Sequence, residues 1–495
     1  MRNQSLGVKS LVLALVLAML VSVFAACTTP QQGGNSTTEG GADVATTVAT
    51  ENTDENGLYY DNLPADLNFN RTVRILGCNQ YKHQFWMESA ESATNPVDLA
   101  IYERNATVEE RLGIEFEWEF VNGDWGSREK YLTAMQTASD GGTPHDGLIA
   151  YNLVPPVVAV RGYAANLYGT EYLDLTGPWW PSVYLEEMLV NDQIYCLVEN
   201  NDIGLLRNIM AMFFNNEMLE ARGMESPYDL VAKNEWTVGT LSEMIKETYE
   251  DFDNDQKVSA GDIFGCSTAT NAKMDCWFFS LGYQYATVRE GQVVSLLGEP
   301  EMNDYLATMI KFLDTDDVYQ YDAEQCKMFM EERAYFYVSG IFMSESIKRG
   351  NLEINFGVVP MPKETSEQED YYTMVHNTHD AWCVPYNVKD LDCSSAVMEA
   401  MASESYRQIG PLYFETYLKL RYAPDERLAD MYDLIRESVT FDFIYLFSCV
   451  YTQSPKEQYK LCFQKPETYN WASVYAQYKN AWDASFQQIV DTYAK

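Results

Sequence analysis

Acidic side chains recur at a regular spacing in the segment DFDNDQKVSAGD, which runs from Asp251 to Asp262. Oxygen-bearing side chains stand at positions 1, 3, 5, 9 and 12 of this twelve-residue loop, and position 7 offers a backbone carbonyl. This spacing resembles that of the calcium loop of EF-hands, in which such groups surround the ion. The sequence therefore predicts a structural calcium site formed by Asp251, Asp253, Asp255, Lys257, Ser259 and Asp262.

Two residues of this loop depart from the usual calcium-binding pattern. Gln256 stands at position 6, where glycine eases a turn with positive φ, and the replacement costs roughly 1 kcal/mol. Asp262 stands at position 12, where a longer glutamate usually binds the ion with both oxygens. An acidic turn without an ion is the alternative interpretation. No other cofactor is expected.

Motifs of the common catalytic and nucleotide-binding sites are absent from the sequence. GxSxG, HExxH, GxxxxGK[ST] and GxGxxG do not occur, and the chain has only 4 His. The one close histidine pair lies in the segment His376-Asn377-Thr378-His379-Asp380, between two stretches that are typical of strands. A metal site, a cleft-edge loop in which His379 and Asp380 bind ligand hydroxyls, and a solvated turn all remain open. We expect no enzyme.

The charge balance excludes one class of partner. The 495 residues include 73 Asp+Glu and 34 Lys+Arg, which gives a net charge of -39. A surface this acidic repels phosphate backbones, so we expect no nucleic acid as a partner. Aromatic residues make up 14% of the chain, which argues against general disorder and suits flat, hydroxyl-bearing ligands.

The N-terminal segment indicates the compartment. A basic start is followed by the apolar run Leu11–Ala26, which is shorter than the roughly 20 residues of a membrane span and is typical of a signal peptide over residues 1–26. Small residues before Cys27 resemble the lipobox of bacterial lipoproteins, although Phe24 replaces the usual leucine. We therefore expect lipidation at Cys27, a flexible tether over residues 27–65, and anchoring on the extracellular face of the cell membrane. An ordinary cleaved signal is the alternative.

Nine further cysteines follow Cys27, an odd number for a disulfide framework. No CxxC motif or zinc-site spacing occurs among them. We expect most of them to act as small buried hydrophobes, and the sequence leaves their pairing open.

Alternating strand and helix signals indicate the fold class. They predict strands over 72–77, 114–120 and 146–150, and helices over 96–112 and 129–138. Asn95 and Pro96 start the first helix, and a glycine ends it. This order predicts a doubly wound α/β fold with ligands at the carboxyl ends of the strands.

An ordered set of segments carries a family resemblance. VEERLGIEFEW, GGTPHDGLIAYN, YLDLTGPWW, NDQIYCLVENN and MFFNNEMLEARGMESPYDL follow the order of elements in extracellular solute-binding proteins of ABC importers, the maltose-binding type. The resemblance implies a two-lobed periplasmic-binding-protein-like fold of type II, with a hinge between doubly wound lobes. One lobe would comprise 66–213 plus 338–388, and the other 214–337 plus 389–495.

The resemblance also implies a function. The protein would be a monomeric, lipid-anchored receptor that binds a mono- or oligosaccharide and delivers it to an ABC transporter permease by hinge closure. The same fold binding a peptide or polyamine is the alternative, followed by a secreted glycan-active enzyme. Beside His379 and Asp380, the candidate ligand-binding residues are Phe85, Trp86, Tyr151, Asn152, Trp277, Phe342 and Trp382.

Overall fold

The computed structural model describes residues 52–269, 272–289, 291–320, 324–350, 354–422 and 426–494. The expected signal peptide and Cys27 lie outside these ranges, as does the expected tether up to residue 51. Among the described helices, none has the length and apolar character needed to cross a membrane.

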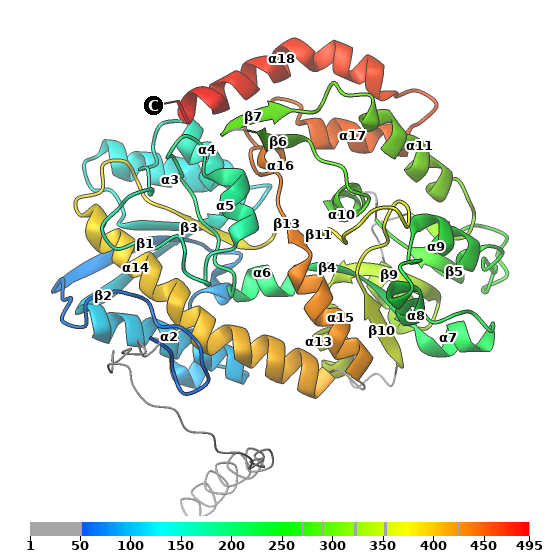
Figure 1. Ribbon diagram of the computed structural model, residues 1–495, viewed down its shortest axis with the longest axis horizontal. Helices are drawn as coiled ribbons and strands as arrows, with labels where there is room; N and C mark the ends of the chain where they lie inside the picture. The colour runs from blue at the N-terminus through cyan, green and yellow to red at the C-terminus, as the bar shows by residue number, and fades with distance from the viewer. Residues whose placement is uncertain are drawn as a thin grey trace, which may run out of the picture. The chain divides into compact units, whose positions relative to one another are not determined.

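The first sheet forms as the strand and helix signals predicted. Its strand order is β12-β3-β1-β2, with β1 parallel to β2 and β3 and with β12 antiparallel to β3. Helices cover it on both faces, α3 and α4 on one and α2 and α14 on the other (Figure 1). The strands are β1 (Arg71–Cys78), β2 (Ile114–Val121), β3 (Gly147–Tyr151) and β12 (Asp380–Cys383), and the helices are α2 (Pro96–Leu112), α3 (Arg128–Asp140), α4 (Pro155–Val160) and α14 (Leu391–Glu404).

The ends of helix α2 confirm the predicted signals. The Asn95 side chain accepts hydrogen bonds from the backbone N–H groups of Val97 and Asp98, and Pro96 occupies the first helical position. Gly113 ends the helix with φ of 61°, a conformation that glycine adopts at little cost.

A second sheet, with strand order β10-β4-β9-β5-β8, mixes parallel and antiparallel pairs. Helices α8 and α15 contact β10, α9 contacts β5, and α12 contacts β9. The strands are β4 (Met210–Asn215), β5 (Phe264–Ser267), β8 (Val318–Tyr319), β9 (Ala334–Gly340) and β10 (Phe356–Val359), and the helices are α7 (Asn216–Ala221), α8 (Pro227–Ala232), α9 (Val238–Ile245), α12 (Gln325–Met330) and α15 (Glu426–Glu437).

Three connections between the sheets can be followed in the described residues (Figure 1). Helix α6 (Ile203–Arg207) leads into β4, and β11 (Thr373–Met374) precedes β12. The third connection is α14, which continues through two π-helical segments toward α15. These π-helical segments are Ser405–Ile409 and Pro411–Tyr422, and β11 pairs with β13 (Val439–Thr440).

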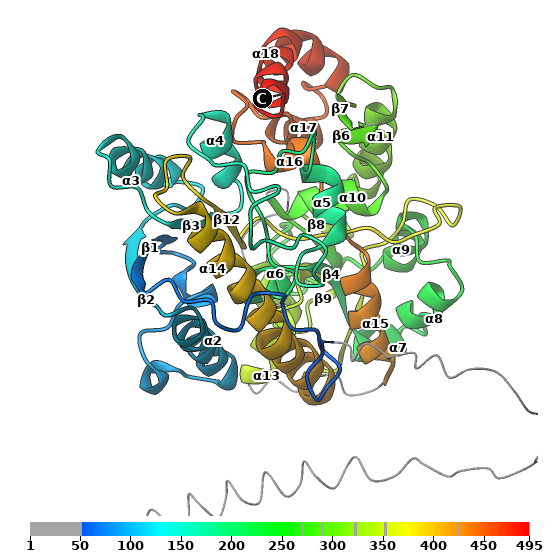
Figure 2. The same ribbon diagram turned by 60° about the vertical axis from the view of Figure 1, so that its left-hand side comes forward.

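The C-terminal elements lie above both sheets in the view of Figure 1. Helix α17 contacts α11, and the last helix, α18, contacts α17, α11 and also α4 beside the first sheet. Figure 2 shows α18 and α17 stacked beside α11. The C-terminal helices are α16 (Phe443–Leu446), α17 (Pro455–Gln464) and α18 (Trp471–Thr492). The earlier elements α10 (Asp275–Ser280), β6 (Ala286–Arg289), β7 (Gln292–Ser295) and α11 (Glu301–Leu313) precede them in the chain, as do α5 (Ser182–Met188) and α13 (Met343–Arg349).

The structure differs from the expected domain boundaries at three places. Strand β10 belongs to the second sheet, although residues 338–388 were expected in the first lobe. Helix α14 contacts α2 beside the first sheet, although residues 389–495 were expected in the second lobe. Both differences arise because long-range pairing, which leaves little trace in local sequence, decides where a segment is placed. The remaining boundaries stay a prediction.

The third difference concerns the expected tether. Residues 52–65 lie against the folded body, with Thr53 bridged to Tyr59 and Asp61 buried. The Asp61 carboxylate pairs with Arg111 of α2 and accepts a hydrogen bond from Ser403 of α14. A buried carboxylate requires such partners. The expectation of a tether that reaches residue 65 is therefore wrong for residues 52–65.

All nine described cysteines are free thiols. Seven of them are buried, Cys449 is partly buried and Cys326 is exposed. Burial raises the pKa of the Cys78 thiol to about 11. This confirms the expectation that most act as small hydrophobic residues.

Candidate functional site

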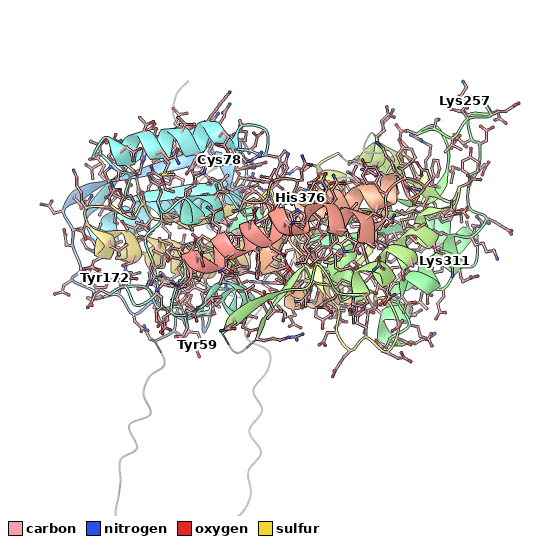
Figure 3. The ribbon with its side chains drawn as sticks, turned by 90° about the horizontal axis from the view of Figure 1, so that it is seen from above. Tyr59, Cys78, Tyr172, Lys257, Lys311 and His376 are labelled. Atoms are coloured by element: carbon pink, nitrogen blue, oxygen red, sulfur yellow. The ribbon has the colours of Figure 1, made fainter. Side chains whose placement is uncertain are left out.

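Two adjoining hollows, together named the cleft, open at the carboxyl ends of the first sheet. They lie side by side, since Tyr81 and Thr378 line both of them. Figure 3 shows His376, a lining residue, in the middle of the molecule, with Cys78 at the end of β1 to one side of it. The Trp125 hollow is lined by Tyr81, Trp125, Tyr151, His376, Asn377, Thr378, Lys456, Glu457, Lys460, Leu461 and Gln464. The Arg207 hollow is lined by Gln80, Tyr81, His83, Gln84, Arg207, Asn208, Phe342, Glu345, Ser346, Arg349 and Thr378.

Aromatic rings from three neighbouring strand ends meet in the Trp125 hollow. Tyr81 follows β1, Trp125 follows β2 and Tyr151 ends β3, so the parallel sheet brings them to the same edge. The rings of Tyr81 and Tyr151 stack with centroids 5.9 Å apart. Trp125 is 41% exposed, and a tryptophan this open in a concave site offers a flat apolar surface to a ligand.

A neutral histidine, His376, lines the cleft, and a second, His379, lies beneath it. Burial lowers the pKa of His376 to about 3 and that of His379 to about 4, so both imidazoles are uncharged at neutral pH. The amide nitrogen of Asn152 lies 3.2 Å from Nε2 of His379, and Nδ1 of His379 lies 3.0 Å from the carbonyl of His376. Because the amide donates to Nε2, Nδ1 carries the proton and donates to the carbonyl.

Two lysines of α17 form the opposite wall of the Trp125 hollow. The Nζ atoms of Lys456 and Lys460 each lie 3.3 Å from a different oxygen of the Asp275 carboxylate. Lys460 also pairs with Glu457 at 3.0 Å. The Lys456 Nζ lies 5.5 Å from the centroid of the Trp125 ring, so positive charge borders the exposed aromatic surface.

The Arg207 hollow has a similar arrangement of charge. Nε of Arg207 lies 3.0 Å from the Glu345 carboxylate, and Nη2 of Arg349 lies 2.9 Å from its second oxygen. One nearly buried carboxylate thus holds two guanidinium groups. Phe342, which is half-exposed, adds an aromatic surface beside them.

The structure brings some of the sequence-predicted candidates to the cleft. Tyr151 and Phe342 line it. Asn152 and His379 lie beneath it and hydrogen-bond each other as described above. Asp380 is buried near Glu199 and Asp202, and burial, followed by the charges of these two neighbours, raises its pKa well above the usual range.

The other four candidates do not line the cleft. Phe85 is buried and stacks on Trp118, while Trp86 is partly buried against Phe120. Trp277 is fully buried, and its indole N–H donates to Thr268 at 3.0 Å. Trp382 is buried within strand β12. Their part in ligand binding stays a prediction.

Sequence reasoning missed several lining residues. Trp125 follows a predicted strand, so the same rule that selected Tyr151 could have found it. Arg207 and Arg349 gave no local signal, because each is the last residue of a short helix, where a basic side chain is common. Lys456 and Lys460 stand at i and i+4 on α17, which places both on one helix face but does not reveal which element that face meets.

The acidic loop lies away from the cleft, as the position of Lys257 in Figure 3 shows. Carboxylate oxygens of Asp251, Asp253 and Asp255 lie within 4.8 Å of one another. Gln256 adopts φ of 61°, the conformation that position 6 of a calcium loop requires.

The remaining expected ligands of this loop differ in exposure. Asp262 is buried, and its Oδ1 has no hydrogen-bond partner among the described residues. Its Oδ2 accepts from the backbone N–H of Ser259 at 2.9 Å. Lys257, which would contribute only its carbonyl, extends an exposed side chain toward Asp255. The donor set of carboxylates and a hydroxyl suits a hard cation such as calcium.

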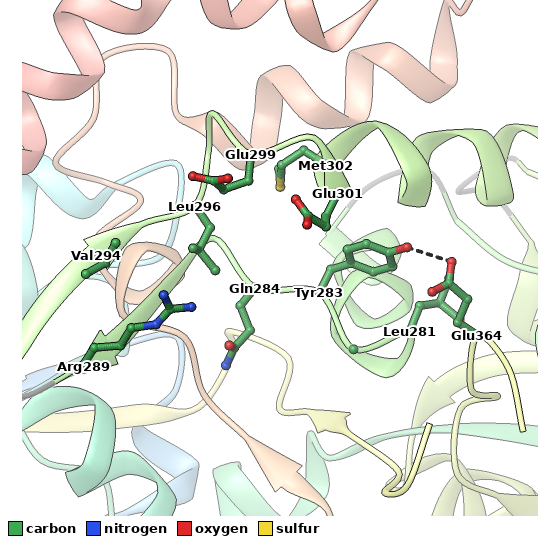
Figure 4. A pocket seen from close by; sticks show the side chains of 11 residues that line it. Leu281, Tyr283, Gln284, Arg289, Val294, Leu296, Glu299, Glu301, Met302 and Glu364 are labelled. Carbon is green, nitrogen blue, oxygen red and sulfur yellow. Dashed lines mark hydrogen bonds between the residues drawn. The ribbon is translucent and has the colours of Figure 1, made fainter. Parts of the chain in front are cut away.

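A further pocket lies between β7, α11 and the loop that carries Glu364 (Figure 4). Tyr283 donates a hydrogen bond to Glu364 at 2.7 Å across one end of it. Three glutamates and one arginine line this pocket, with Tyr283 as its one aromatic residue. It stands away from the strand ends of the first sheet, so the cleft is the better candidate site.

Solved structures of similar fold include sugar-binding proteins. The sugar-binding protein MalE from Xanthomonas citri is 14% identical and aligns over 86% of this chain and 97% of its own, with a TM-score of 0.54. A cyclo/maltodextrin-binding protein complexed with maltotetraose is 12% identical over 86% and 96%, with a TM-score of 0.53. The apo form of RafE from Streptococcus pneumoniae is 14% identical over 88% and 98%, with a TM-score of 0.50. These likenesses confirm the two-lobed fold.

Comparison with curated protein sequences finds no match. A family profile described as bacterial extracellular solute-binding protein, by contrast, matches residues 106–409, which is more than half of the chain. The matched range begins within α2 and runs through both sheets to the π-helical segment after α14. The chain therefore belongs to the family of bacterial extracellular solute-binding proteins.

Proposed function

We propose that this protein is a carbohydrate receptor that binds its ligand in the cleft and delivers it to an ABC importer. Closure of the two lobes about their connections would bury the ligand, and the closed form would dock on the permease. The protein would act as a monomer and would carry out no chemistry on the sugar.

The exposed ring of Trp125 is the observation that carries the proposal. Sugar rings present apolar C–H faces that stack on aromatic rings, and their hydroxyls bind planar polar groups. The Trp125 hollow supplies both, with Tyr81 and Tyr151 beside the tryptophan and the side chains of Asn377 and Thr378 on the floor. The sugar-binding proteins of similar fold add support.

The charges of the cleft argue against the alternatives. A polyamine site needs several free carboxylates, whereas the two lining glutamates, Glu345 and Glu457, are paired with cations. A glycosidase needs a pair of carboxyl groups of which one has a raised pKa. The two lining glutamates line different hollows and each is ion-paired with lysine or arginine, so neither is a free acid beside a second carboxylate.

A ligand screen tests the proposal. The chain from Thr28 to Lys495 keeps every described residue and can be tested by thermal shift against sugars, peptides, polyamines and amino acids. We expect a saccharide to raise the melting temperature and to remain uncleaved in chromatography of the mixture. Stabilisation by a peptide or polyamine alone would favour the first alternative, and steady release of a cleaved sugar would show an enzyme.

We also propose that Cys27 carries the lipid that anchors the receptor on the extracellular face of the membrane. The support is the signal-like segment that ends in small residues directly before Cys27. Several acyl chains at about 0.8 kcal/mol per buried CH₂ hold a protein on a bilayer stably.

The acidic loop is proposed to hold a structural calcium ion. Its support is the clustering of Asp251, Asp253 and Asp255, the positive φ of Gln256, and the unpartnered buried oxygen of Asp262. The ion would neutralise carboxylates that otherwise repel one another, and would stabilise the second lobe without contact to the sugar.

A further inference from the structure

We propose that the ligand of the cleft is an oligosaccharide that carries carboxylate groups, such as an oligomer of a uronic acid, and not a neutral sugar. This inference rests on the proposed receptor function and names the class of sugar. It follows from the charges that line the two hollows and from the way these charges are paired.

The charge balance of the cleft is the reverse of that of the chain. Its lining includes the cations Arg207, Arg349, Lys456 and Lys460, and only two carboxylates. The chain as a whole has 34 Lys+Arg against 73 Asp+Glu. A concave site with excess positive charge attracts anions, even where the surface around it is acidic.

In both hollows two cations share one buried carboxylate, and in the Trp125 hollow the partly exposed Glu457 pairs with both lysines as well. In the Trp125 hollow, Lys456 and Lys460 share Asp275, and the side chains of both lysines are almost buried at 2% and 7% exposure. Glu457, the other partner, is 40% exposed and therefore screened by water. The two lysines are therefore matched by two carboxylates, of which only Asp275 is shielded from solvent, so the water-screened Glu457 leaves part of their positive charge to attract a further anion.

In the Arg207 hollow, Arg207 and Arg349 share Glu345 in the same way. The side chain of Arg349 is 56% exposed, so its remaining N–H groups face solvent. A guanidinium binds a carboxylate through two parallel hydrogen bonds, which is a geometry that a neutral hydroxyl does not match. The two hollows would thus bind successive carboxylates of one chain.

The floor of the cleft experiences the same positive field. Burial is the largest cause that lowers the pKa of His376, and the charges of Lys456 and Lys273 add to it. Trp125 lies at the edge of this region and would stack on a sugar ring while the lysines bind its carboxylate.

The test compares sugars that differ only in charge. Full-length protein in an uncharged, non-glycosidic detergent is titrated by calorimetry with trimers of galacturonic, glucuronic and mannuronic acid, and with their methyl esters. We expect at least one acid to bind ten-fold or more tightly than its ester, with an affinity that falls as salt rises. Esters or neutral trimers that bind as tightly as the acids would overturn this inference and leave the receptor function intact. If no saccharide binds, both proposals fail.

Single-residue variants test which cations of the cleft bind the carboxylates of the ligand. Arg349→Gln, at an exposed helix end, should weaken the binding of the acid several-fold and leave the binding of the ester unchanged. Lys460→Gln should act in the same direction in the other hollow. Lys465→Gln, just beyond the end of α17 and exposed, is the matched control and should change neither. Equal loss of acid and ester binding in both variants would contradict the proposal.

Discussion

The side chain of Asn152 donates a hydrogen bond to Nε2 of His379 over 3.2 Å, beneath the cleft. This bond joins the end of β3 to the segment that leads into β12, two parts of the chain that are 227 residues apart. It also determines which imidazole nitrogen carries the proton, and so holds the His376–Asp380 segment in place under the ligand.

Replacing Asn152 by alanine should therefore destabilise the fold. The variant leaves the buried Nε2 of His379 without a donor, and we expect the free energy of unfolding to fall by about 1–3 kcal/mol in urea denaturation. Asn122→Ala, which removes an exposed amide pair with Asn79, is the control and should change it by less than about 0.5 kcal/mol. Equal effects of the two variants would contradict this role.

Glu399 should make stability depend on pH. Burial raises its pKa to about 8, while Trp180 donates a hydrogen bond to it at 3.2 Å. Between roughly pH 4.5 and 8 the native state keeps a proton on this carboxyl that the unfolded state releases. The contribution of Glu399 to the free energy of unfolding therefore falls as the pH rises, and it levels off above about pH 8.

Glu399→Gln should remove this contribution. We expect the loss of stability between pH 5 and pH 8.5 to be smaller in the variant by on the order of 2–4 kcal/mol, measured by urea unfolding at both values. Glu437→Gln, at the exposed end of α15, should keep the wild-type slope. An unchanged slope in Glu399→Gln would show that the carboxyl is already ionised at neutral pH.

Trp125→Ala should weaken sugar binding by ten-fold or more with little loss of stability. An aromatic contact adds about 0.5–1.5 kcal/mol beyond its burial, and about 1.4 kcal/mol corresponds to ten-fold in affinity. Calorimetry with the best saccharide of the screen measures the change. Tyr386→Ala removes a ring that is 57% exposed outside the cleft, and its affinity should equal that of the wild type. If Trp125→Ala binds the sugar as tightly as the wild type, Trp125 does not stack on the ligand.

Calcium should raise the melting temperature of the wild-type protein. Millimolar calcium binds only the native loop, so mass action stabilises the fold. Asp253→Ala should abolish the rise and leave sugar binding largely intact, because the loop stands apart from the cleft. A melting temperature that responds neither to calcium nor to EDTA would show that the loop is an acidic turn that binds no calcium.

Cys27→Ala should release the protein from membranes. Without a cysteine at this position no lipid can be attached, so the membrane affinity that acyl chains supply is lost. Membrane fractionation of cells that express the wild type and the variant measures the change. Cys326→Ala, which alters an exposed cysteine of the folded body, is the control and should stay in the membrane fraction. Retention of Cys27→Ala in the same fraction would contradict the lipid anchor.

Local signals predicted the first sheet well. The strand over 114–120 and the helix over 96–112 formed as expected, because period-two alternation and the Asn95–Pro96 start act within a few residues. The order of such elements was also enough to identify the family. Several long-range placements were not predicted, among them β10 in the second sheet and residues 52–65 against the folded body.

In the candidate site, too, local sequence predicted some features and the tertiary structure decided others. The sequence by itself determined that aromatic residues follow the strands of the first sheet, and hence that Tyr151 borders the cleft. Only the tertiary structure decided that Trp125 is exposed while Trp277 is core, and that Lys456 lies beside the Trp125 ring. The physical reason is that the exposure and the charge pairing of a residue depend on which distant part of the chain packs over it. A local sequence pattern can indicate that a residue is apolar, but it does not indicate which distant segment will cover it.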